Sequence, residues 1–119
     1  MKNLLFAEQQ PPAPPSTVEV IEALEQARLL LADGHWLAKG NAVEWADDDW
    51  PCWCIVGAIT RASRTTQIRD AALTAVRFAL PGRWRSNIEA YNDHDATTLD
   101  EAKVLLHNAK RFVGTVAAA

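Results

Sequence analysis

The sequence lacks the features that mark several large classes of protein. No apolar run approaches the ~20 residues that a membrane-spanning helix needs, so we expect no membrane association. The apolar stretch before Glu8 is too short for a secretory signal, which predicts a cytoplasmic protein. There are only two cysteines, Cys52 and Cys54, and in a reducing compartment we expect both to be free thiols.

Recognisable metal-binding and catalytic motifs are also missing. Paired zinc ligands usually have two residues between the cysteines, whereas a single residue separates Cys52 from Cys54. The favoured interpretation is therefore no bound metal, no cofactor and no enzymatic activity. The alternative is a small cysteine- or metal-dependent hydrolase. Such an enzyme would use a cysteine with His94, or acidic residues drawn from Asp47–Asp49, Asp93 and Asp95.

Positive charge is scarce overall but concentrated in one stretch. The net charge of −3 argues against general nucleic-acid binding, yet residues 61–85 contain six arginines and one acidic residue. Arginine beside an aromatic ring suits phosphate groups. Two interpretations stay open: this stretch pairs with the acidic first half of the chain, or it binds a nucleic acid or nucleotide. The candidate binding residues are Arg61, Arg64, Arg69, Arg83, Trp84 and Arg85.

Helical periodicity is what the sequence does contain. Capping-box patterns at Ser16/Glu19 and Thr98/Glu101 predict a first helix from residue 17 to about 32 and a last helix from residue 99. Between them we predict helices over 51–63 and 66–79 and a short helical piece around 86–91. No segment shows the alternation of a strand. The predicted fold is all-α: a single compact domain of four main helices over residues 17–119.

The predicted helix over 51–63 is apolar on nearly all sides, which is typical of a central helix. We expect Ile55 and Ile59 to lie in the core, and Gly57 to let a neighbouring backbone approach closely. The segment before it, residues 35–50, contains three of the five tryptophans. We expect this Trp-rich loop to fold over the core.

Residues 1–16 form a Pro-rich N-terminal arm, outside the core, that favours extended polyproline geometry. The arm contains an apolar cluster, Leu4, Leu5 and Phe6, which is a candidate interface. We expect this cluster to dock in an apolar groove, on its own domain or, preferably, on another chain.

The segment CWCIVGAITRAS, followed by NIEAYND and then by a Thr-capped amphipathic helix, resembles a known protein family. This is a small all-helical domain family of unknown function from actinobacteria and their phages, with a Cys-centred apolar helix and an aromatic-Asn-Asp motif. Tyr91, Asn92 and Asp93 stand at that motif, and the resemblance covers about residues 18–113. It implies the helical fold but no activity.

Tyr91, Asn92 and Asp93 are also candidate binding residues in their own right. Asn and Asp favour turns in which their side chains bond the local backbone, so we predict a turn here. A ligand pocket formed by this turn and nearby tryptophans is the alternative.

Together these observations predict a small non-enzymatic binding or interaction protein, a bacterial or phage accessory protein such as an inhibitor or adaptor. Its expected partner is another protein, self or heterologous. Nucleic-acid binding and hydrolase activity remain the alternatives.

Overall fold

The computed structural model describes residues 14–46 and 49–118 of the chain. The candidate interface residues Leu4, Leu5 and Phe6 and the acidic pair Asp47–Asp48 lie outside the described residues. In chain order, the elements are α2 (Thr17–Ala32), β1 (Val43–Ala46), β2 (Trp50–Trp53), α3 (Ile55–Ala62), α4 (Thr66–Ala79), the 3-10 helix η2 (Gly82–Trp84), α5 (Ile88–Asp93) and α6 (Leu99–Ala118).

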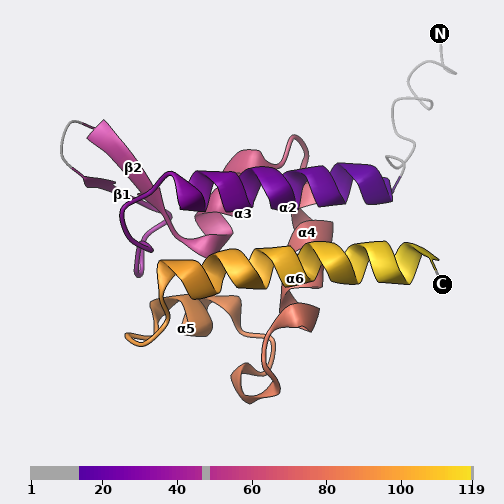
Figure 1. Cartoon of the computed structure of the whole chain (residues 1–119). Coiled ribbons are helices and arrows are strands. Elements are labelled where there is room, and N and C mark those ends of the chain that lie inside the picture. The colour runs from indigo at the N-terminus through magenta and orange to yellow at the C-terminus, as the bar shows by residue number, and fades with distance from the viewer. Residues whose placement is uncertain (1–13, 47–48, 119) are drawn as a thin grey trace, which may run out of the picture.

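The two longest helices, α2 and α6, lie side by side and antiparallel (Figure 1). Each begins at a capping box of the kind predicted: Ser16 Oγ accepts from the Glu19 amide at 3.1 Å, and Thr98 Oγ1 accepts from the Glu101 amide at 3.1 Å. A side-chain contact links the two helices, because Lys110 on α6 donates to the carboxylate of Glu25 on α2 at 3.0 Å. The predicted starts of these helices are confirmed.

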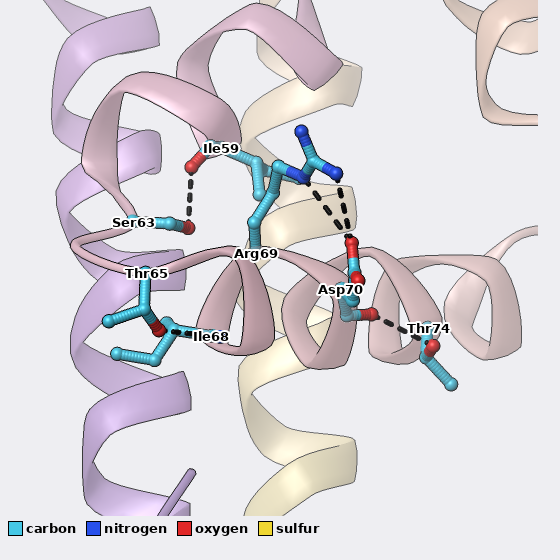
Figure 2. A network of polar contacts seen from close by, with 7 residues as sticks. All are labelled: Ile59, Ser63, Thr65, Ile68, Arg69, Asp70 and Thr74. Carbon is cyan, nitrogen blue, oxygen red and sulfur yellow. Dashed lines mark hydrogen bonds and ion pairs between the residues drawn. The ribbon is translucent and has the colours of Figure 1, made fainter. Parts of the chain in front are cut away.

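Helix α4 also begins where local chemistry predicts. Figure 2 shows Thr65, whose hydroxyl accepts from the Ile68 amide at 3.1 Å, and Ser63, whose hydroxyl donates to the Ile59 carbonyl at 2.7 Å. The helix ends at Ala79, just before Pro81, which lacks the N–H that a further turn would need.

The core lies where α2, α3, α4 and α6 meet. Ile55 and Ile59 on α3 are fully buried, as predicted, and so are Leu24 on α2 and Val76 on α4. In the part of the chain that the structure describes, no helix combines the length and apolar character needed to cross a membrane.

The all-α prediction is wrong in one region, because β1 and β2 form an antiparallel hairpin in which Val43 pairs with Trp53 and Ala46 with Trp50. Helix α3 accordingly begins at Ile55 rather than Pro51. Tryptophan and valine favour strands, and Pro51 is tolerated because a two-stranded hairpin consists of edge strands only. The fold is therefore mostly helical with a small sheet.

Candidate binding site at the hairpin end

A cavity of about 480 Å³ opens beside the hairpin, between residues 40–42, the first turns of α3, and α5. Its walls are mainly apolar, with charged groups from Arg61, Glu89 and Asp93. Three of the predicted candidate residues, Arg61, Asn92 and Asp93, are brought together here. The full lining is Gly40, Asn41, Ala42, Trp53, Cys54, Val56, Gly57, Thr60, Arg61, Glu89, Asn92 and Asp93.

One wall depends on a close approach between residues 40–42 and helix α3. A Cβ atom placed on Gly57 would lie 2.2 Å from the Ala42 carbonyl oxygen, so glycine is required at this position. The same carbonyl accepts from the Cys54 amide at 3.0 Å. The prediction that Gly57 admits a neighbouring backbone is confirmed.

The opposite wall is fixed by Asn92, whose side chain is only 2 % exposed. Its Oδ1 accepts from the Ile55 amide at 2.8 Å, and its Nδ2 donates to the Ala38 carbonyl at 2.7 Å. The predicted turn at Tyr91–Asp93 is wrong, since these residues form the last turn of α5. Asn92 uses its hydrogen bonds across the fold, where it satisfies two buried backbone groups that would otherwise lack partners.

Lys39 does not line the cavity, but it supports this wall. Its ammonium group donates to three carbonyl oxygens, that of Asn92 in the last turn of α5 and those of His94 and Thr97 just after it, at 2.6, 2.8 and 2.8 Å. A cation at this position also interacts favourably with the helix dipole. Sequence reasoning missed Lys39, because its partners lie more than fifty residues away and no local pattern connects them.

Asp93 lies beside this network and also lines the cavity. Its carboxylate accepts from the Asn92 side chain at 3.0 Å and from the Gly40 amide at 2.8 Å. These two hydrogen bonds, in that order, lower the pKa of Asp93 below its ordinary value. The carboxylate is therefore ionised at neutral pH, and it ties residue 40 to α5.

The cysteines do not have the character of nucleophiles. Cys54 is the N-cap of α3, where its Sγ accepts from the Gly57 amide at 3.1 Å, and burial raises the pKa of its thiol. A nucleophilic thiolate needs the opposite shift. Cys52 was expected in the first turn of a helix, but it lies in β2, where its buried Sγ accepts from the His35 amide at 3.4 Å.

The hairpin extends the apolar wall of the cavity outward. Side chains alternate between the faces of a strand, so Val43, Trp45, Pro51 and Trp53 share one face of the hairpin. Trp53 lines the cavity, and Trp45 on the same face is 61 % exposed. We call these four residues the hairpin face.

The expectation that the Trp-rich loop folds over the core is wrong, because Trp36, Trp45 and Trp50 are all exposed. The indole N–H of Trp36 donates to Glu44 at 3.2 Å, and that of Trp50 donates to the Asp33 carbonyl. These bonds tie the two rings to Glu44 of β1 and to the residue that follows α2. Their polar atoms are satisfied there, so the rings need not enter the core.

The arginine-rich stretch is divided among several elements. Arg64 approaches Glu19 at 3.4 Å, and Arg69 lies beside Asp70 at 3.2 Å, as Figure 2 shows for the second pair. Arg61 faces the cavity. Of these two pairs, only Arg64 with Glu19 joins the arginine-rich stretch to the acidic first half of the chain, because Asp70 belongs to the stretch itself.

The last candidates gather around η2. Arg83 lies 5.4 Å from the ring centroid of Trp84, and Arg85 follows with a left-handed φ of 50°. The Trp84 ring meets Tyr91 edge-on, with centroids 5.5 Å apart, and Tyr91 is buried. Tyr91 is thus a packing residue that does not line the cavity, whereas its neighbours Asn92 and Asp93 do.

Within the described ranges, 14–46 and 49–118, no group of three or more His, Cys, Asp or Glu side chains is arranged to hold a metal ion. The acidic set considered above includes Asp47 and Asp48, which lie outside those ranges.

Comparison with known proteins confirms the resemblance to a family of unknown function. No curated protein and no solved structure matches the chain. The family model described as "Family of unknown function (DUF6197)" matches residues 15–112, from the start of α2 into α6 and including every residue that lines the cavity. The chain therefore belongs to the family of unknown function DUF6197.

Proposed function

We propose that this protein is a non-enzymatic binding protein that recognises another protein through the cavity and the adjoining hairpin face. The observation that carries the proposal is the cavity itself, about 480 Å³ in volume and lined mainly by apolar groups. Ligand pockets typically measure about 300–1,000 Å³ and combine apolar walls with a few polar groups. A large apolar side chain of a partner is the occupant that such a lining favours.

The hairpin face supports a protein partner over an isolated small molecule. Trp45 lies outside the cavity and is 61 % exposed, so a ligand confined to the cavity would leave it uncovered. Tryptophan is enriched among the residues that dominate binding energy at protein interfaces. If a partner protein inserts one side chain beside Trp53, the partner surface around that side chain can contact Trp45.

Rigid walls strengthen the proposal, because a surface that is already ordered loses little conformational entropy on binding. Asn92 and Lys39 fix the α5 wall by five hydrogen bonds to backbone groups. Gly57 and Ala42 fix the opposite side through direct backbone contact.

The chemistry of the cavity supports binding without catalysis. The only cysteine in its lining, Cys54, has a pKa raised by burial, and its sulfur is already engaged by the Gly57 amide. A role as an inhibitor or adaptor belongs to the same proposal, since either role needs a recognition surface and no reaction.

The proposal is tested by a substitution that fills the cavity, followed by a measurement of whether the protein still binds its partner. Thr60 is an exposed residue of the cavity lining, so Thr60→Trp places a large ring in the opening without touching the core. Gln67→Trp is the matched control, because Gln67 is also exposed and helical but lies outside the cavity. Both variants should melt within a few degrees of the unmodified protein.

The readout is affinity capture from the native host, with proteins identified by mass spectrometry and nucleic acid assayed in the same eluate. We expect a protein that the unmodified chain and Gln67→Trp capture and that Thr60→Trp loses by at least tenfold. Equal capture by Thr60→Trp would contradict the proposal, and so would an eluate that contains only nucleic acid.

A further inference from the structure

The pairing of the two hairpin strands decides which of their backbone groups point outward. Pro51 lacks an N–H group, so its pair with Trp45 cannot be a hydrogen-bonded pair of the ladder. Hydrogen-bonded and non-hydrogen-bonded pairs alternate along antiparallel strands, so the N–H and C=O groups of Val43 and Trp45 point away from β2. The Cys54 amide donates to the Ala42 carbonyl at 3.0 Å, as this alternation requires.

One outer edge of the hairpin is closed and the other is open. On β2, the Ala38 amide donates to the outward carbonyl of Trp53 at 3.1 Å, and Pro51 offers no N–H to a further strand. Proline on an edge is one of the ways in which proteins prevent strand pairing. On β1, the outward backbone groups of Val43 and Trp45 have no hydrogen-bond partner in the described part of the chain. We call these groups the open edge.

The open edge leads towards the cavity. Residues 40–42, which precede β1 in the chain, all line the cavity. Because a strand advances about 3.3 Å per residue, a segment paired with Val43 that continues in this direction reaches the cavity within about three residues. Its side chains on one side would lie over the hairpin face, where Trp45 is 61 % exposed. One surface therefore combines free main-chain groups, an exposed indole and an apolar cavity.

The charge of this surface favours a basic segment. The charged side chains of the described hairpin region and of the cavity lining are mostly acidic: Glu44, Asp49, Glu89 and Asp93, against Arg61. Complementary charge favours one partner and suppresses others. Pairing of β1 with β1 of a second copy would bring the acidic residues of two hairpins together, so a second copy is disfavoured.

We infer that the partner contributes an extended basic segment, with apolar residues at alternate positions, which adds to the hairpin as a third strand along the open edge. The inference rests on the proposed function and specifies its partner. In strand addition, main-chain hydrogen bonds provide affinity and pockets for alternate side chains provide specificity. Val43 and Trp45 supply the main-chain groups, and the hairpin face and the cavity receive the side chains.

The test uses peptides selected on the unmodified full-length protein from a random library displayed on phage, with affinity measured by fluorescence polarisation. Trp45→Pro is compared with Trp45→Ala, because both variants lose the indole but only Trp45→Pro loses the outward N–H. Proline is tolerated on an edge strand where its missing N–H faces solvent, so the pairing with β2 should persist. We expect basic peptides that bind Trp45→Pro about tenfold more weakly than Trp45→Ala, since a peptide carbonyl is left without a donor.

Peptides N-methylated at single positions provide a second measurement, on the unmodified protein. Methylation of alternate amides should weaken binding, and methylation of the intervening amides should not, because successive amides of a strand point to opposite sides. Equal affinity of the two Trp45 variants would overturn the inference, and so would an effect of methylation without alternation. A library that yields no binding peptide would do the same.

Two further outcomes separate this inference from the proposed function. If Thr60→Trp loses the peptides while the two Trp45 variants bind them equally, the cavity remains the binding site and only the pairing along the open edge is wrong. If Thr60→Trp retains the peptides while Trp45→Pro loses them, the open edge binds the segment and the proposed role of the cavity is wrong. A dimer in analytical ultracentrifugation that Trp45→Pro converts to single chains would place a second copy at the open edge and overturn the inference.

Discussion

Replacing Asn92 with alanine should be among the most destabilising single changes in this protein. The substitution removes the acceptor of the Ile55 amide and the donor to the Ala38 carbonyl, and both of those residues are fully buried. A buried polar group left without a partner costs about 1–3 kcal/mol, so two such groups predict a loss of about 2–6 kcal/mol. Whole domains of this kind are stable by only about 5–15 kcal/mol.

The assay is urea unfolding followed by circular dichroism. A shift of the midpoint at unchanged slope measures the loss of stability without a change in the surface exposed on unfolding. Asn41→Ala is the control, because Asn41 is an exposed asparagine at the same cavity and its loss should stay within about 0.5 kcal/mol.

The variant Asn92→Asp retains one of the two contacts and removes the other. Its carboxylate can still accept from the Ile55 amide, but it has no proton to donate to the Ala38 carbonyl. We therefore expect a clear loss for both Asn92→Asp and Asn92→Ala. A loss below 1 kcal/mol for Asn92→Ala would refute the view that these two hydrogen bonds fix the wall of the cavity.

Three further predictions address packing, pH and charge. Gly57→Ala should destabilise by about 1–3 kcal/mol in denaturant unfolding, because its Cβ would lie 2.2 Å from a backbone oxygen, whereas Gly114→Ala, with open space around it, should be neutral or stabilising. A guanidinium and an ammonium group lower the pKa of Glu25 from 4.5 to about 2, so the stability it contributes above pH 4.5 is lost as the pH falls towards 2. The Glu25→Gln variant should therefore lose less melting temperature than the unmodified protein as the pH falls from 4.5 towards 2. An equal loss in both proteins would count against the ion pair. If the stretch around η2 binds nucleic acid, replacing Arg83 and Arg85 with alanine should weaken that binding and its salt dependence, and absence of binding at low salt would exclude the hypothesis.

The sequence predicted the elements whose chemistry is local. The predicted caps at Ser16 and Thr98 bind an amide only three residues further along the chain, so a short sequence pattern is enough to identify them. The burial of Ile55 and Ile59 followed from a run of apolar residues. These features need no knowledge of the rest of the fold.

The hairpin was not predicted because its strands are only four residues long, and each strand is stabilised by pairing with the other one. The pattern from Pro51 onward is equally typical of a helix start, since proline is favoured in the first helical turn. The competing extended conformation is stabilised by pairs such as Val43 with Trp53, and these pairs become visible only when the strands are aligned.

The cavity was predicted only in part. Asn92 and Asp93 were singled out as a motif, but their role as the wall of a cavity depends on Lys39 and Ala38, more than fifty residues away. The tryptophans were expected in the core because they are large and apolar. Trp36 and Trp50 instead remain exposed and donate their N–H groups to Glu44 and to the Asp33 carbonyl, contacts that composition alone does not predict.

The measurement that tests the central claim most directly is an NMR titration of the labelled protein with N-acetyl-phenylalaninamide, a minimal mimic of an inserted apolar side chain. We predict saturable shifts, at millimolar concentration, of the backbone amides of Gly40, Gly57 and Thr60 around the cavity, and their loss in the Thr60→Trp variant. Shifts confined to residues that do not line the cavity, or no saturable shift at the cavity, would contradict the proposal that this cavity is the binding site of the protein.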